Sequence, residues 1–121
     1  MSKKDELVQR PLRRTEYRLE FHSHEAGKGW RDIQATAHNA TVDAWDRLTR
    51  SPLEEDSARQ YRLKGDYACI QYGGKTYVRW QYKITNGGRI WYFVVHDPTG
   101  KHAGVVRLER CSPGHPKETD F

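Results

Sequence analysis

The sequence has no hydrophobic run that approaches the length of a membrane span. About 18 consecutive apolar residues are needed to cross a bilayer as a helix, whereas 31% of this chain is charged and its mean hydropathy is −0.99. The first residues are basic and lead into no apolar segment, so we expect no secretory signal. The absence of both features predicts a soluble, cytoplasmic protein.

Cysteine is scarce, which bears on disulfides and on metal sites. Cys69 and Cys111 are the two in the chain, and they form no CxxC pair and no other zinc-type spacing. Their positions neither require nor forbid a disulfide. His22 and His24 resemble a metal-binding pair, but no third or fourth ligand follows at a suitable spacing, and we interpret them as loop residues. We expect no metal and no cofactor.

Aromatic residues, in contrast, are abundant. Four Trp, seven Tyr and three Phe stand in a chain of 121 residues, and side chains of this size argue against disorder because they bury large areas. The length fits one compact domain and leaves little room for a second. We expect a flexible basic tail over residues 1–14 and a single domain over residues 15–121.

The positive charge is confined to the second half of the chain. Residues 1–56 carry 10 basic and 11 acidic side chains, a net charge of −1, whereas residues 57–121 carry 11 basic and 5 acidic side chains, a net charge of +6. A basic surface attracts polyanions because binding releases their condensed counterions. The charge asymmetry therefore favours a nucleic-acid partner for the second half, although a solvated basic face would show the same asymmetry.

The N-terminal half predicts one strand and two helices. Apolar and polar residues alternate over 15–21, as in a half-buried strand. Apolar residues then recur at steps of three and four over 28–50, which is typical of an amphipathic helix. Ser51, Pro52 and Glu54 match a cap, a first helical position and a capping box, so we expect a short second helix to about residue 60.

The C-terminal half predicts strands that are joined by short turns. The expected strands are residues 67–72, 75–84, 89–95 and 103–110. Gly and Asn at the junctions supply the positive φ that tight hairpins need, and short connections imply antiparallel neighbours. The fold class is therefore α+β: an N-terminal strand, two helices, then an antiparallel meander of about four strands with the helices packed on one face.

The strand that ends at Ile84 has two faces of different chemistry. Val78, Trp80, Tyr82 and Ile84 form an apolar face, which we expect to meet the helices. The intervening residues form a polar and basic face that includes Arg79 and Lys83. By the same alternation Trp91 falls on the side of Arg89, which makes it the one tryptophan that we expect to be available for stacking on a base.

Four short motifs occur in a fixed order along the second half. Arg62-Leu63-Lys64-Gly65-Asp66 precedes the strand that carries Arg79; Gly88-Arg89-Ile90-Trp91-Tyr92 follows one hairpin later, and Gly114-His115-Pro116-Lys117-Glu118-Thr119 comes near the end. This succession, together with the order of the predicted elements, resembles the RelE/HigB-type toxins of the RelE/ParE toxin–antitoxin superfamily. The resemblance covers roughly residues 15–121.

The resemblance implies a RelE-like fold and the toxin of a type II toxin–antitoxin system. Such a toxin is a metal-independent mRNA endonuclease that acts at the ribosome and is held inactive by a cognate antitoxin. It implies that Arg79 and Arg89 lie on neighbouring strands at the centre of the cleft. The resulting candidate catalytic residues are Arg89, Arg79, His115, Lys64 and Lys117, and the candidate RNA-binding residues are Arg62, Lys83, Arg107 and Arg110.

The residue types suit cleavage of RNA by its own 2′-hydroxyl. The reaction needs a base for that proton, cations for the charge that develops on phosphorus, and an acid for the leaving 5′-oxygen. Arginine remains protonated and its planar fork meets two phosphate oxygens, so Arg79 and Arg89 suit the charge role. A histidine has an unperturbed pKa near about 6.5, so His115 suits proton transfer.

The sequence departs from the family pattern at its end. Many members carry a catalytic tyrosine after the last motif, where this chain has Thr119-Asp120-Phe121. Either His115 or Asp120 takes over proton transfer, or the chain binds RNA and cuts it poorly. Two other readings stay open: a non-enzymatic ParE-like toxin that inhibits DNA gyrase, and a plain nucleic-acid-binding domain without toxicity.

Overall fold

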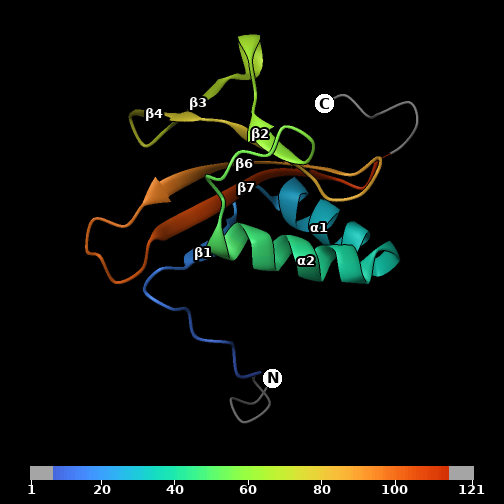
Figure 1. Ribbon diagram of the computed structural model, residues 1–121, viewed down its shortest axis with the longest axis horizontal. Helices are drawn as coiled ribbons and strands as arrows, with labels where there is room; N and C mark the ends of the chain where they lie inside the picture. The colour runs from blue at the N-terminus through green and yellow to red at the C-terminus, as the bar shows by residue number, and fades with distance from the viewer. Residues whose placement is uncertain (1–6, 115–121) are drawn as a thin grey trace.

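The computed structural model describes residues 7–114, which form an α+β fold of two helices and two sheets (Figure 1). The elements in chain order are β1 (Tyr17–Phe21), α1 (His24–Thr36), α2 (His38–Arg50), β2 (Gln60–Arg62), a 3-10 turn (Gly65–Tyr67), β3 (Cys69–Tyr72), β4 (Lys75–Val78), β5 (Trp80–Lys83), β6 (Arg89–His96) and β7 (Gly104–Ser112). Each helix has 13 residues, and within the described part of the chain neither is long and apolar enough to cross a membrane.

The main sheet is mixed, not antiparallel throughout. Its strand order is β1-β7-β6-β5-β2, and β1 runs parallel to β7 with Tyr17 opposite Gly104 and Phe21 opposite Leu108. The other neighbours in this sheet are antiparallel. The antiparallel prediction was wrong for β1 because short turns constrain only consecutive strands. In the sequence, β1 and its partner β7 are the first and last elements, so no short turn sets their relative direction.

Two helices are present, but not where the sequence pattern predicted them. The chain breaks at Ala37, whose φ of −141° and ψ of 61° lie outside the helical region, so the expected 28–50 helix is two helices. The first begins earlier, at His24, because the Ser23 hydroxyl accepts a hydrogen bond from the Ala26 backbone N–H at 3.0 Å and caps it. Both helices lie on one side of the main sheet (Figure 1).

The predicted short helix over 51–60 is wrong. The described chain runs through turns there, and its carbonyls are used in tertiary contacts. The buried Gln60 side chain donates to the Ser51 carbonyl at 2.7 Å, and the Tyr92 hydroxyl donates to the Pro52 carbonyl at 2.7 Å. These bonds override the local capping signal, because tertiary packing outweighs intrinsic propensity in a segment this short.

The core lies between the two helices and the main sheet. Ile33, Ala44 and Leu48 of the helices are at most 1% exposed and belong to one buried cluster with the sheet residues. The cluster includes Trp80, Tyr82 and Ile84, which confirms the predicted apolar face for that part of the strand. Val78 is 46% exposed, so the prediction fails there.

The cause is a break in the predicted 75–84 strand at Arg79. The Arg79 backbone N–H donates to the Ala68 carbonyl at 2.9 Å, and its carbonyl accepts from the Leu63 N–H at 2.9 Å. Before this residue, β4 pairs with β3 in a separate two-stranded sheet, with Gly73 and Gly74 at positive φ in the turn. This hairpin lies on the other side of the main sheet from the helices (Figure 1).

Candidate nucleic-acid interface

The face of the main sheet that points away from the helices carries most of the predicted site residues. We call it the outer face. Alternation places Gln81, Lys83, Arg89, Trp91, Phe93 and Arg107 on it, because their neighbours in the strands are core residues. A bulge between Trp91 and Tyr92 in the β6–β7 pairing brings both Glu109 and Arg110 to the same face.

Arg79 is paired with a carboxylate on this face. Its guanidinium makes a two-point contact with Glu109, with Nε–Oε2 at 2.8 Å and Nη2–Oε1 at 2.7 Å. A third donor, Nη1, reaches the Tyr67 carbonyl at 3.2 Å. The two side chains are 12% and 15% exposed. In this state the charge of Arg79 is neutralised, so any phosphate ligand would have to compete with Glu109 for it.

Trp91 lies beneath these side chains instead of offering a ring to solvent. Alternation predicted correctly that it shares the face of Arg89, but it is 6% exposed. The guanidinium carbons of Arg79 and Arg110 lie 5.3 Å and 5.5 Å from its ring centroid, and the Tyr67 ring lies 5.2 Å away. Trp91 therefore holds cations in place by cation–π contact and is not available as a base-stacking platform in this structure.

Hydrogen bonds connect Trp91 to an aromatic side chain on the edge strand. The indole Nε1–H donates to Gln81 Oε1 at 2.8 Å, and Gln81 Nε2 donates to the Tyr61 hydroxyl at 2.7 Å. The Lys83 ammonium lies 5.7 Å from the Tyr61 ring centroid. Sequence reasoning placed Gln81 on the polar face but overlooked Tyr61, because the three-residue strand β2 was not predicted.

The structure does not bring Arg79 and Arg89 together. Arg89 pairs with Lys83 at one end of the β5–β6 ladder, whereas Arg79 stands before Trp80 at the other end. The Arg89 guanidinium donates from Nη1 to the carbonyls of Thr85, Asn86 and Gly88 at 3.3, 3.0 and 2.9 Å. In this position it holds the turn between β5 and β6 and stands beside Lys83 at the rim of the outer face.

Arg107 lies on the opposite side of the outer face, in β7. Its Nη1 contacts Glu20 Oε1 at 2.9 Å, its Nε donates to His22 Nδ1 at 3.1 Å, and its guanidinium lies 4.8 Å from the Tyr72 ring centroid. Burial lowers the pKa of His22, and the positive charge of Arg107 lowers it further. The neutral imidazole is thus the form that accepts this hydrogen bond. The sequence pattern had marked His22 only as a loop residue.

A cavity of about 460 Å³ opens at the β2 edge of the outer face. We call it the edge cavity; its lining is Glu55, Ser57, Tyr61, Arg62, Leu63 and Lys64. Both predicted cations of the Arg62-Leu63-Lys64 motif are therefore part of one site, and Tyr61 connects that site to the outer face. Arg62 Nη2 contacts Glu55 Oε1 at 3.1 Å, and these side chains are 59% and 46% exposed.

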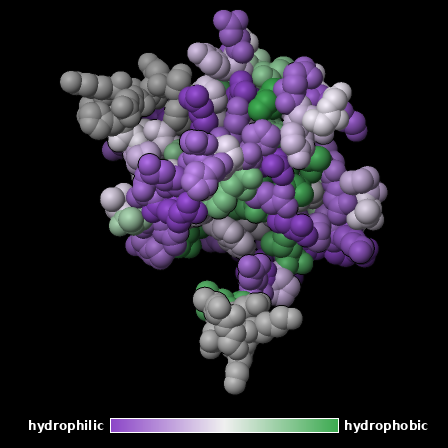
Figure 2. Space-filling model, turned by 180° about the vertical axis from the view of Figure 1, so that it is seen from behind, coloured by the Kyte–Doolittle hydropathy of each residue, from purple (hydrophilic) through white to green (hydrophobic). Residues whose placement is uncertain are grey.

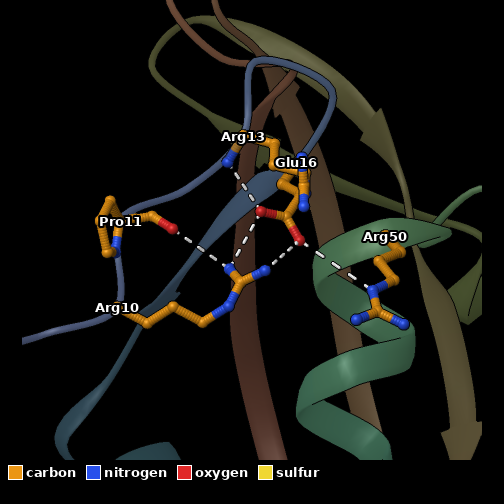
Figure 3. Close-up of polar contacts among 5 residues, drawn as sticks. All are labelled: Arg10, Pro11, Arg13, Glu16 and Arg50. Atoms are coloured by element: carbon orange, nitrogen blue, oxygen red, sulfur yellow. Dashed lines mark hydrogen bonds and ion pairs between the residues drawn. The ribbon is translucent and has the colours of Figure 1, made fainter.

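The N-terminal segment is attached on the helix side of the sheet. Figure 3 shows the Glu16 carboxylate between Arg10, the Arg13 backbone N–H and Arg50. Arg10 contacts both carboxylate oxygens, at 3.0 and 3.1 Å, and the Arg13 N–H donates at 2.7 Å. The hydrogen bond from Arg10, followed by that from Arg13, lowers the pKa of Glu16. Part of the predicted tail is thereby bound to the domain at Arg10.

Two predicted catalytic residues, His115 and Lys117, lie outside the described residues, as does Asp120. Within residues 7–114, no group of three His, Cys, Asp or Glu side chains is placed to hold a metal ion.

The side of the molecule that Figure 2 shows is predominantly hydrophilic, with separate apolar patches.

No protein-family model, no curated protein and no solved structure matches this chain. The assignment of a function therefore depends on the residues themselves and on the chemistry of the face that they build.

Proposed function

We propose that this protein is a toxin of the RelE type, an mRNA endonuclease that holds single-stranded RNA on its outer face. The observation that carries the proposal is the interleaving of cations with aromatic rings there. Cations lie against the rings of Tyr61, Tyr72 and Trp91. The outer face carries more cations than acids. Its cations include Arg79, Lys83, Arg89, Arg107 and Arg110, and its acids include Glu20 and Glu109. Proteins that bind single strands combine cations with aromatic rings.

The exposed cations would make the first contacts with phosphate. Arg110, Arg62 and Lys64 are exposed, and none of them lies in the core. Arg79 would then exchange its two contacts with Glu109 for two phosphate oxygens, since a guanidinium meets a carboxylate and a phosphate with the same fork geometry. This exchange would place a delocalised charge beside the phosphorus that the 2′-hydroxyl attacks.

The proposal of RNA cleavage depends on the order of the sequence motifs. This order supports catalytic roles for Arg89, Arg79, His115, Lys64 and Lys117. His115 would transfer the proton, and the lysines would assist with charge. The same motif order supports mRNA at the ribosome as the substrate and a cognate antitoxin as the partner.

Binding is tested with a fluorescein-labelled single-stranded RNA and fluorescence anisotropy. Lys83→Ala combined with Arg110→Ala removes two cations of the outer face, and we expect binding to weaken at least tenfold and its salt dependence to become shallower. Lys28→Ala combined with Arg31→Ala removes two exposed charges from α1, on the opposite side of the sheet, and is the matched control. Equal affinities in both variants would refute the outer face as the binding surface.

Cleavage is tested by induced expression in bacteria with primer extension on an abundant mRNA. Wild type should arrest growth and produce new mRNA ends, and His115→Ala should produce neither. Growth arrest with intact mRNA would overturn the endonuclease and favour the gyrase-inhibiting alternative, which a purified supercoiling assay would then detect. No arrest and no cleavage would leave a nucleic-acid-binding domain without toxicity.

A further inference from the structure

We infer that the edge cavity is a specificity pocket for one unpaired guanine of the bound RNA. This inference rests on the proposed function, because it assigns a base to a pocket beside the proposed RNA surface. The cavity volume of about 460 Å³ lies within the range of ligand sites in proteins. Its lining combines apolar walls, an acceptor and cations within ten consecutive residues of chain, 55–64.

The cavity is continuous with the outer face through Tyr61. This side chain lines the cavity and also accepts the hydrogen bond from Gln81, which in turn accepts from Trp91. A strand that lies across Lys83 and Arg110 therefore passes the mouth of the cavity. Tyr61 and Leu63 supply apolar surface against which a base can pack.

The polar groups of the cavity match the edges of guanine. Glu55 accepts one hydrogen bond through Oε1 from Arg62, and within residues 7–114 its other oxygen, Oε2, has no hydrogen-bond partner. A carboxylate can accept from the paired N1–H and N2–H donors of guanine. Arginine is the side chain that most often donates to guanine O6 and N7. Glu55 and Arg62, which already lie side by side, could thus hydrogen-bond to two edges of the same guanine.

The ion pair between Glu55 and Arg62 does not close the pocket. Both side chains are about half exposed, and an ion pair in water contributes little to stability, so a ligand can reorganise it at small cost. Lys64, also exposed, lines the same cavity and would hold a phosphate next to the base. Uracil fits this pocket less well than guanine because it offers the carboxylate one donor, N3–H, flanked by two carbonyl acceptors that the carboxylate repels.

The first experiment is an NMR titration of the ¹⁵N-labelled full chain with GMP, AMP, CMP or UMP. We expect GMP to shift the amide signals of residues 55–64 at concentrations at least tenfold below those at which the other nucleotides do so. Equal responses to all four nucleotides, or shifts outside the cavity only, would overturn the guanine assignment.

The second experiment separates this inference from the proposed function. Two labelled RNAs are compared by anisotropy, one of uridines alone and one with a single guanosine at its centre. We expect the guanosine to strengthen binding at least about fivefold, the lower end of what a bidentate base contact supplies. Glu55→Gln should abolish this increment; because it also releases Arg62 for phosphate, the affinity for the uridine RNA should not fall. Glu54→Gln, a neighbouring exposed glutamate that does not line the cavity, should keep the increment.

The two failures have different signatures. If both RNAs bind with equal affinity, the guanine pocket is wrong and the RNA surface stands. If neither RNA binds, the proposed function fails. The inference also fails if Glu54→Gln and Glu55→Gln reduce the increment alike.

Discussion

Arg79 and Glu109, 30 residues apart in the chain, form a two-point ion pair above the ring of Trp91. The pair joins the start of β5 to β7 across the intervening strand β6. It occupies the arginine that we propose as a phosphate contact. Under that proposal the carboxylate of Glu109 would compete with RNA for Arg79, of which it is also a structural partner.

Glu109→Gln should strengthen RNA binding and weaken the fold. The substitution removes the charge that holds Arg79, so we expect affinity for single-stranded RNA to rise several-fold, together with a loss of about 1–3 kcal/mol in the free energy of unfolding. Anisotropy and urea denaturation measure the two effects. Glu25→Gln is the control, since it removes an exposed acid from α1, on the opposite side of the main sheet from Glu109. A Glu109→Gln protein with unchanged RNA affinity would contradict the competition.

Glu16 should make the stability of the protein depend on acid pH. Its contacts with Arg10 and the Arg13 N–H lower its pKa in the folded state below the unfolded value of about 4.3. A lowered folded pKa contributes stability that is present above the unfolded value and is lost as pH falls through the folded value. Unfolding midpoints in urea between pH 7 and pH 2 measure this loss.

Glu16→Gln should remove that part of the acid dependence and lower stability at pH 7. Glu25→Gln, an exposed glutamate in the first turn of α1, is the matched control and should retain the wild-type pH profile. Parallel profiles for wild type and Glu16→Gln would show that the contacts in Figure 3 do not contribute to folding.

The two cysteines should differ sharply in reactivity. Cys69 is exposed, whereas Cys111 is buried in the core and burial raises the pKa of its thiol to about 12. Because the thiolate is the reactive form, we expect one fast-reacting thiol in the folded protein and two in denaturant. Labelling with a thiol reagent and mass spectrometry checks the count. Cys69→Ser should abolish the fast reaction, and a fast-reacting Cys111 would contradict its burial.

Gly29→Ala should destabilise the protein by about 3 kcal/mol or more. A Cβ at Gly29 would lie 1.7 Å from the Cys111 carbonyl oxygen, so α1 could no longer approach β7 as closely. Gly27→Ala is the control in the same helix. The nearest atom to its new Cβ is the flexible Arg31 Nη1 at 3.3 Å, and alanine has the higher helix propensity. Urea denaturation gives the change in the free energy of unfolding for each variant. The two changes should differ in sign or by several kcal/mol, and equal losses would contradict this packing.

The alternation of apolar and polar residues correctly predicted which side chains are buried wherever a strand packs on the core with one of its faces. It predicted the first strand, the burial of Trp80, Tyr82 and Ile84, and the side on which Trp91 lies. It failed at Arg79, because the chain leaves the main sheet there through backbone bonds to Leu63 and Ala68. Those partners are more than ten residues away, and no local pattern encodes them.

The sequence predicted which cations belong to the candidate site, but it did not predict their arrangement in space or the residues between them. Arg62 and Lys64 were identified from charge and motif order and Lys83 from strand alternation, and the structure places all three around Tyr61. Tyr61 and Glu55 were not predicted, since neither stands in a motif and β2 is too short to show a pattern. The separation of Arg79 from Arg89 depends on strand register, which only the paired sheet reveals.

The sequence by itself determined the α+β class, the basic second half and the alternating faces of the strands, because each of these depends on neighbours within a few positions. Tertiary structure decided the break at Ala37, the parallel pairing of β1 with β7 and the capture of Arg79 by Glu109. These features arise from contacts between segments far apart in the chain. Their energies depend on burial and geometry that exist only once the sheet and helices are packed together.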